Sequence, residues 1–126
     1  MPGDPFRRCD LVLVDFGTGV GSEQSGVRPA LVISNDGFNH HFPLATVLPL
    51  TKREGKRRKV YAFEVVLPAG SAGNPVESIV MPHQVRTVAR ARLQRRLGRL
   101  TAPHLQADIE DRVLDHLGVG FETDDA

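Results

Sequence analysis

Short apolar segments, each closed by turn-forming residues, constrain the fold of this 126-residue chain more than any other feature. The segments are rich in Val, Ile, Leu and Phe, and clusters of Gly, Pro, Asn and Ser separate them, which is typical of short β-strands. In one of them Tyr61, Phe63 and Val65 alternate with other residues, which predicts a half-buried strand. We predict strands over residues 10–16, 29–34, 44–50, 60–67, 76–82 and 84–88.

One amphipathic helix is predicted near the end of the chain. Its apolar residues recur at steps of three and four, with Thr101 and Pro103 marking the start and Gly118 the end. Many strands and one clear helix predict a mainly-β fold, a small antiparallel barrel with a C-terminal helix. The length predicts a single domain over 1–126, with a core at about 9–118 and flexible segments at 1–8 and 119–126.

Charge is distributed unevenly along the chain, although the net charge is only +1. Most basic residues lie before residue 101, whereas most of the charged residues after this point are acidic. Two basic runs stand out, one over residues 52–59 and one from Arg86 to Arg99, and such runs are typical of nucleic-acid-binding surfaces. The alternative is that both runs are simply solvated surface.

A glycine-rich loop leads directly into an Arg-Pro pair and an apolar strand. Because Pro29 restricts the preceding residue to extended backbone, Arg28 is predicted to begin the strand from a rigid base below the loop. Its guanidinium is always charged and carries several donors in one plane, which suits it to a phosphate group. The alternative for Arg28 is a salt bridge to Glu23 in the loop.

Several functional classes are not supported by the sequence. The glycine loop precedes a strand and lacks Gly-Lys-Ser/Thr, so a nucleotide-binding loop is excluded. The five histidines are scattered or adjacent, so we expect no metal site and no cofactor. The single cysteine, Cys9, is expected to be a small, partly buried apolar residue, and its isolation fits a reducing cytoplasm. No apolar run is long enough to span a membrane.

Four blocks in one order resemble the MazF/PemK toxins, mRNA interferases of type II toxin–antitoxin systems. They are an opening strand at 10–16, the signature at 21–34, the strand ending in Leu48-Pro49-Leu50-Thr51, and residues 77–88. The resemblance covers residues 9–118 and implies an SH3-like barrel of the CcdB/PemK type that assembles as a homodimer. It also implies a cytoplasmic toxin that partners an antitoxin with an acidic, flexible segment.

The resemblance implies a metal-independent endoribonuclease acting on single-stranded mRNA. In this reaction a ribose 2′-hydroxyl attacks the adjacent phosphorus and leaves a 2′,3′-cyclic phosphate and a 5′-hydroxyl. Arg28 and Thr51 stand at the family's two catalytic positions, the first to stabilise charge and the second to hold the phosphate or the 2′-oxygen. Glu23 is a third catalytic candidate, to orient the guanidinium or contact the 2′-hydroxyl. Taken alone, Thr51 is equally explained as a hydroxyl that caps a turn.

The predicted RNA-binding residues surround these positions. Phe16 is the predicted platform for base stacking, and Ser78 and Gln84 match family positions beside the RNA, although packing within the sheet explains Ser78 equally well. The remaining candidates are basic and are expected to contact the RNA backbone: Lys52, Arg53, Lys56, Arg57, Arg58, Lys59 and Arg86.

Two departures from the family pattern are visible. The opening block reads Cys9-Asp10-Leu11-Val12, and Lys52 follows the threonine where many members have a hydroxyl residue. Two alternatives to the nuclease stay open at this stage: a non-catalytic toxin that grips a protein, as gyrase inhibitors of the same fold do, and an RNA-binding domain without cleavage.

Overall fold

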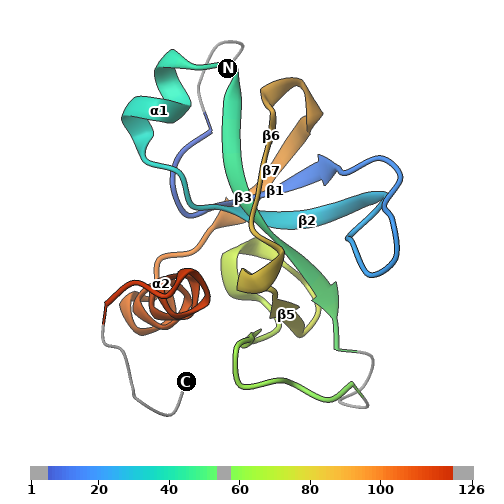
Figure 1. Cartoon of the computed structure of the whole chain (residues 1–126), viewed down its shortest axis with the longest axis vertical. Coiled ribbons are helices and arrows are strands. Elements are labelled where there is room, and N and C mark those ends of the chain that lie inside the picture. Colours follow the sequence, from blue (N-terminus) through green and yellow to red (C-terminus); the bar gives the residue numbers. More distant parts are fainter. Residues whose placement is uncertain (1–5, 54–57, 121–126) are drawn as a thin grey trace.

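The computed structural model describes residues 6–53 and 58–120, and Figure 1 shows the arrangement of its elements. In this described part seven strands form one antiparallel sheet, in the order β4-β5-β3-β2-β1-β7 with β6 pairing to β3. The strands are β1 (Asp10–Asp15), β2 (Val27–Val32), β3 (Leu44–Lys52), β4 (Val65–Leu67), β5 (Ser78–Val80), β6 (Arg86–Ala89) and β7 (Leu93–Arg99). The helices are α1 (Asp36–His41) and α2 (Pro103–Leu117), with single 3₁₀ turns at η2 (Ser71–Gly73), η3 (Pro82–Gln84) and η4 (Arg90–Arg92).

The mainly-β prediction with a C-terminal helix is confirmed, but the sheet is open. Its two outer strands are β4 and β7, and no ladder joins them within the described residues. The long strand β3 holds the sheet together, because its first half pairs with β6 and its last residues pair with β5. Strand β2 pairs with the middle of β3. Because the two strands are antiparallel, the residues just before the paired part of β2 lie opposite the residues just after the paired part of β3.

Apolar side chains are buried on both faces of the sheet. Successive residues of β1 point to opposite faces, so Leu11 and Val12 enter different clusters. One cluster lies between the sheet and α2, where Ile109 is the fully buried helix residue. The other fills the concave side between β1, β2, β3 and β6. This double burial explains why the strand sequences read as nearly continuous apolar runs.

Helix α2 agrees closely with its predicted limits. Pro103 occupies the first turn, where its missing N–H costs no hydrogen bond, and Gly118 ends the helix at φ 71°. The N-cap is Ala102 and not the expected Thr101. Cys9 is partly buried against the same apolar cluster as α2, as predicted. Among the described residues no helix combines the length and apolar character required to cross a bilayer.

Three predictions of secondary structure were wrong or incomplete. Helix α1 was missed, although Asn35 caps it by accepting a hydrogen bond from the Phe38 N–H at 2.8 Å. Strand β7 was missed because arginines on its exposed face conceal the short apolar pattern. The strand expected over residues 60–67 begins only at Val65, since Tyr61 to Glu64 forms a turn with the Glu64 N–H donating to the Tyr61 carbonyl at 2.9 Å. The other predicted strands are present, with ends that differ from the predicted ones by at most two residues, and β3 extends beyond its predicted end to Lys52.

Candidate active site

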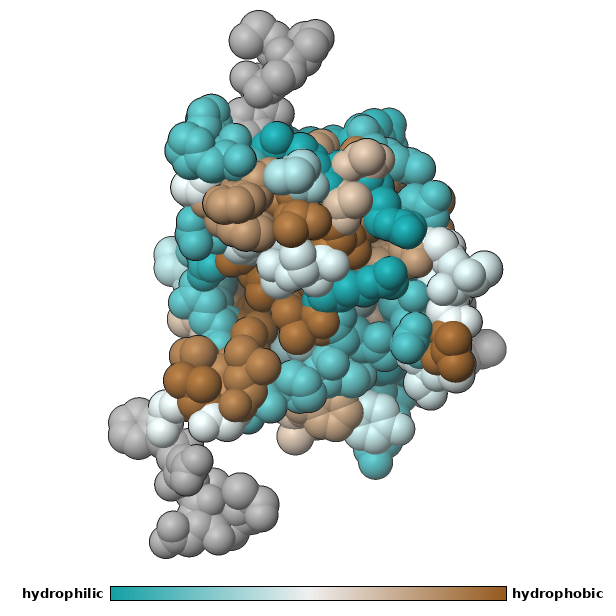
Figure 2. All heavy atoms as spheres, turned by 45° about the horizontal axis from the view of Figure 1, so that its top comes forward, coloured by the Kyte–Doolittle hydropathy of each residue, from teal (hydrophilic) through white to brown (hydrophobic). Residues whose placement is uncertain are grey.

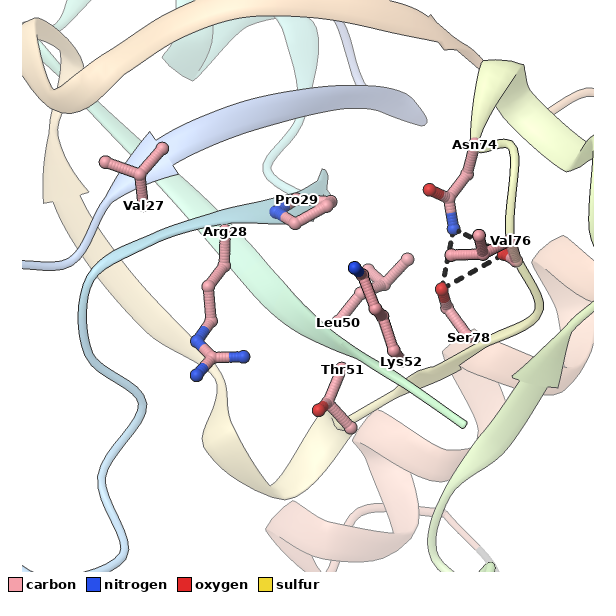
Figure 3. Close-up of a pocket in the computed structure, with 9 residues that line it drawn as sticks. All are labelled: Val27, Arg28, Pro29, Leu50, Thr51, Lys52, Asn74, Val76 and Ser78. Carbon is pink, nitrogen blue, oxygen red and sulfur yellow. Dashed lines mark hydrogen bonds between the residues drawn. The ribbon is translucent and has the colours of Figure 1, made fainter. Parts of the chain in front are cut away.

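An open hollow of about 320 Å³ lies where β2 and β3 separate, and it brings Arg28 and Thr51 together. Figure 3 shows the Arg28 and Thr51 side chains extending to the same side of the strand pair, while the Lys52 side chain extends the other way, beside Leu50. The hollow is lined by Val27, Arg28, Pro29, Leu50, Thr51, Lys52, Asn74, Val76 and Ser78.

Strand register explains why Arg28 and Thr51 meet. The β2–β3 ladder pairs Ala30 with Pro49, and continuing this register by two residues places Arg28 opposite Thr51. The ladder stops there because Pro29 has no N–H to donate, which leaves the two strand ends apart. Arg28 is also paired through its backbone to Val14 of β1, so its base is fixed inside the sheet.

The Arg28 guanidinium is oriented by its own loop. Its Nε donates to the Ser25 carbonyl at 2.9 Å, and no hydrogen bond within the described residues occupies its Nη groups. No ion pair joins Arg28 to Glu23 in the described chain, so the salt-bridge alternative does not hold. Glu23 also does not orient the guanidinium, because its carboxylate accepts the Val20 N–H at 3.3 Å within the loop. The half-buried guanidinium therefore keeps both Nη groups, which carry four N–H donors, without a hydrogen bond to the described residues.

Thr51 lies within a strand and does not end one. It pairs with Ile79 of β5, and the next pair joins Lys52 to Ser78. The alternative of a turn-capping hydroxyl is therefore wrong. Because side chains alternate along a strand, Thr51 points away from the apolar cluster that Leu50 joins, and both residues line the hollow.

One side of the hollow is a buried hydrogen-bond group of Ser78 and Asn74, and Asn74 was not among the residues predicted for the site. The Asn74 side-chain amide donates to the Ser78 Oγ at 2.7 Å and to the Val76 carbonyl at 2.9 Å. Ser78 is itself buried and its hydroxyl donates to the same carbonyl, so packing explains this residue better than base reading. The Gly73-Asn74-Pro75 turn was the available signal, since Asn in such turns bonds to nearby backbone.

Close backbone contact fixes the position of Asn74. A Cβ added to Gly73 would lie 2.2 Å from the Leu97 carbonyl oxygen, and one added to Gly98 would lie 2.3 Å from that of Ala72. Only glycine permits η2 and β7 to approach so closely, and Gly73 also adopts a φ of +78°. This side of the hollow is thus held against the far edge of the sheet.

A second, more polar hollow of about 350 Å³ lies beside Pro49. Gln84 connects it to the glycine-rich loop, donating from Nε2 to the Ser22 carbonyl at 2.8 Å and accepting the Gln24 N–H at 3.3 Å. Glu23 therefore lies at this second hollow and not at the first. The lining residues are Phe16, Glu23, Gln24, Pro49, His83, Gln84, Val85 and Arg86.

The Gln84 bridge predicts a measurable change in the loop. Replacing Gln84 by alanine removes both hydrogen bonds, so amide exchange at Gln24 should accelerate by about ten-fold, since each bond is worth roughly 1 kcal/mol. Hydrogen–deuterium exchange followed by mass spectrometry measures this directly. The Gln84→Glu variant keeps the acceptor and loses the donor, so it should show a smaller change. Equal exchange in all three proteins would show that Gln84 does not hold the loop.

Two predicted contacts need correction at this hollow. Phe16 is only 1% exposed and belongs to the concave apolar cluster, so its ring is not available as a stacking platform. Arg86 covers that ring, with its guanidinium carbon 5.8 Å from the centroid, and donates to the Phe16 carbonyl at 3.4 Å. Arg86 lines this hollow, its predicted contact with RNA stays a prediction, and part of its donor capacity is already used.

His83, one of the scattered histidines, is half-buried and lines the second hollow. Burial lowers its pKa below the ordinary 6.5, and the neighbouring Glu64 carboxylate opposes this shift only in part. Its Nδ1 is buried and makes no hydrogen bond with the described residues. The lowered pKa favours the neutral form of the ring.

The basic segment 52–59 is not uniformly free for RNA. Arg53 pairs with Glu77 at 3.5 Å, and Arg58 donates to both oxygens of Glu64 at 2.9 Å. Lys52 and Lys59 are exposed. The remaining predicted contacts, Lys56 and Arg57, lie outside the described residues.

Fold and hollow together define a class: a small mainly-β domain with an open cationic cleft suited to a phosphate ester. The chain belongs to the PemK-like, MazF-like toxins of type II toxin–antitoxin systems, because the model of this family matches residues 7–117. The resemblance seen in the sequence is thereby confirmed.

Named relatives agree with this assignment. The chain is 35% identical over 117 residues to endoribonuclease MazF9 of Mycobacterium tuberculosis, covering 89% of this chain and 96% of the relative. It is 32% identical over 115 residues to endoribonuclease EndoA of Bacillus subtilis, covering 91% and 93%. The crystal structure of MazF from Deinococcus radiodurans superimposes with a TM-score of 0.77 at 31% identity, covering 92% of this chain and 99% of that one.

Proposed function

We propose that this protein is a toxin endoribonuclease that cleaves single-stranded mRNA. The observation that carries the proposal is the pairing of Arg28 and Thr51 at one open hollow in a chain of this toxin family. Its relatives from M. tuberculosis and B. subtilis are both named endoribonucleases, which supports the same activity here.

In the proposed reaction the RNA supplies its own nucleophile. The ribose 2′-oxygen loses its proton and bonds to the adjacent phosphorus, and the bond from phosphorus to the 5′-oxygen breaks. The leaving oxygen takes up a proton, and the products are a 2′,3′-cyclic phosphate and a 5′-hydroxyl. The protein must therefore stabilise the extra negative charge that develops on the non-bridging oxygens.

Arg28 is suited to that charge. Its Nε bond to Ser25 fixes the guanidinium plane, so both Nη groups can donate to the two non-bridging oxygens without reorganisation. Thr51 adds a hydroxyl that can bond to the same phosphate or to the 2′-oxygen. The exposed Lys52 ammonium adds positive charge at the rim of the same hollow.

The second hollow is the proposed site for bases next to the cleaved bond. Gln84 and Arg86 line it and offer an amide and a cation for hydrogen bonds to base edges. Glu23 lies there too, where its carboxylate can accept from a 2′-hydroxyl. Lys52, Arg53 and Lys59 are proposed to contact the backbone, which makes binding depend on salt.

We further propose a homodimer with an SH3-like barrel in each subunit, silenced by an antitoxin in the cytoplasm. The D. radiodurans MazE–MazF complex, 29% identical to this chain with a TM-score of 0.71, supports an antitoxin partner. Figure 2 shows apolar side chains gathered at the surface near the end of α2, and the exposed residues there are Leu114, Leu117 and Val119. Exposed apolar side chains that cluster in this way are typical of a protein interface.

A single incubation tests the proposed activity. The pure protein is mixed with a long single-stranded RNA in EDTA, and the ends of the fragments are mapped. We expect discrete fragments with 5′-hydroxyl and 2′,3′-cyclic phosphate ends. RNA that is retained on a filter but stays intact would instead show a binding domain without cleavage. RNA that is neither bound nor cut would favour a toxin that acts on a protein.

A further inference from the structure

Two aromatic side chains stack on each other at the surface beside the basic segment. The ring centroids of Tyr61 and Phe63 lie 5.3 Å apart with their planes only 2° from parallel. Both residues remain exposed, Tyr61 by 46% and Phe63 by 42%. A large part of each aromatic residue is therefore left at the surface, where a ligand can contact it.

The turn that carries these rings is fixed by hydrogen bonds from two sides. The Glu64 carboxylate accepts the Tyr61 N–H at 3.1 Å and two hydrogen bonds from Arg58. From the other side, Arg112 of α2 donates to the Ala62 carbonyl at 2.9 Å. The two rings are therefore held in place before any ligand arrives, which lowers the entropy cost of binding to them.

The stack is continuous with the second hollow on one side and with a cation on the other. Phe63 meets the His83 ring edge-on at a centroid distance of 4.6 Å, and His83 lines that hollow. At the other end the Lys59 ammonium lies 5.2 Å from the Tyr61 ring centroid. A ligand that leaves the hollow past His83 thus meets an aromatic face and then a positive charge.

This combination fits single-stranded nucleic acid better than other ligands. Base stacking on an aromatic side chain needs no particular sequence, and the neighbouring cation neutralises a phosphate. Lys59 is exposed and long, so its ammonium can move from the Tyr61 ring to a phosphate while a base takes its place on the ring.

We propose that the Tyr61–Phe63 stack, together with Lys59, is a base-stacking site for RNA outside the cleavage hollow. Its occupant is a base that flanks those held in the second hollow, and the site extends the RNA footprint without reading sequence. The inference rests on the proposed ribonuclease function, since it assigns a further contact to the same substrate.

The chain supplies both a probe and a control. Tyr61 is the single tyrosine and the chain has no tryptophan, so its intrinsic fluorescence reports on this surface alone. A second stacked pair, Phe38 and Phe42 of the α1 region, has centroids 5.2 Å apart and planes at 20°. That pair neighbours His40 and His41 and no basic run, so it is a matched control.

The experiment titrates the full protein with a mixed-sequence, end-labelled RNA in which every 2′-hydroxyl is methylated, so that the nucleophile is blocked. We expect Tyr61 emission to be quenched with the same Kd that the label reports. The double variant Tyr61→Leu/Phe63→Leu should bind at least about five-fold more weakly, as loss of one stacked base requires. Phe38→Leu/Phe42→Leu should bind like the wild type, and thermal unfolding verifies that both variants fold.

Three results would overturn the inference. The first is unchanged Tyr61 emission at saturating RNA, and the second is an unchanged Kd for RNA in the double variant. The third is an unchanged Kd for RNA in the double variant together with weaker binding of the cognate antitoxin, which would assign the stack to a protein interface. A cleavage assay with unmodified RNA distinguishes failure of the stacking site from failure of the proposed ribonuclease function. A wild type that cleaves RNA with a silent Tyr61 refutes the stacking site alone, whereas a wild type that neither binds nor cleaves RNA refutes the proposed function as well.

Discussion

Replacing Arg28 by alanine is expected to abolish RNA cleavage while leaving the fold intact. The guanidinium is the charged donor best placed to stabilise the developing phosphorane, and loss of one such donor lowers a rate by about 10²–10³. The side chain is only half-buried and its one hydrogen bond to the described part of the chain is to the Ser25 carbonyl, so the sheet does not depend on it. Binding of RNA should weaken much less than cleavage, because the cations on the basic segment are unchanged.

Cleavage of a labelled RNA under single-turnover conditions measures this effect, with thermal unfolding as the test of folding. Arg95→Ala is the matched control, since Arg95 is an exposed arginine of β7 that lines neither hollow. Arg28→Lys keeps the charge but not the planar pair of donors, so it should restore only a small part of the rate. Cleavage by Arg28→Ala at the wild-type rate would show that the active site is elsewhere.

Replacing Glu64 by alanine is expected to cause the largest loss of stability of any surface-turn substitution. Its side chain is fully buried, while that of its partner Arg58 is 31% exposed. Removing one partner of a buried ion pair typically costs about 3–5 kcal/mol, and because Arg58 can turn toward water we expect about 3 kcal/mol. The same change frees the Tyr61 N–H, so the aromatic stack should loosen as well.

Urea unfolding gives the free energy, and Asp108→Ala is the control because it breaks the exposed Asp108–Arg112 pair, with an expected change within about 0.5 kcal/mol. The pH dependence gives a second test. Burial alone would raise the Glu64 pKa, but bonds from Arg58 and Tyr61 hold it below the ordinary 4.5. The stabilisation is therefore fully present above pH 4.5 and is lost as the pH falls through the lower pKa of the folded state. Parallel stability curves for wild type and Glu64→Ala in acid would contradict this role.

Much of the candidate site was predictable, because it depends on local rules. The Arg28-Pro29 pair fixes extended backbone at the start of a strand, and Thr51 follows an apolar strand that was also recognised. The sequence could not show that Ser78 is buried by Asn74 or that Phe16 belongs to the core. Both depend on which face of a strand is covered, and that requires the packing of other elements.

In the fold, too, some elements were predictable from local sequence and others depend on tertiary packing. The apolar runs and the steps of three and four in α2 indicated a mainly-β domain with a C-terminal helix. Strand β7 was hidden because an edge strand with one solvated face tolerates arginines, and the turn at Tyr61 to Glu64 was hidden because its residue types favour strands. Propensity was overruled there by the Arg58–Glu64 pair, a contact between side chains that only the folded chain brings together.

The sequence by itself determined the family, the strand-rich class and the two residues most suited to a phosphate, since each rests on neighbouring residues or on a conserved order of short blocks within the chain. Tertiary structure alone decided which cations remain free, which aromatic rings face solvent, and that Glu23 and Gln84 share a second hollow. Those outcomes depend on burial and on pairing between segments far apart in the chain, and no local pattern encodes the distance between two such segments.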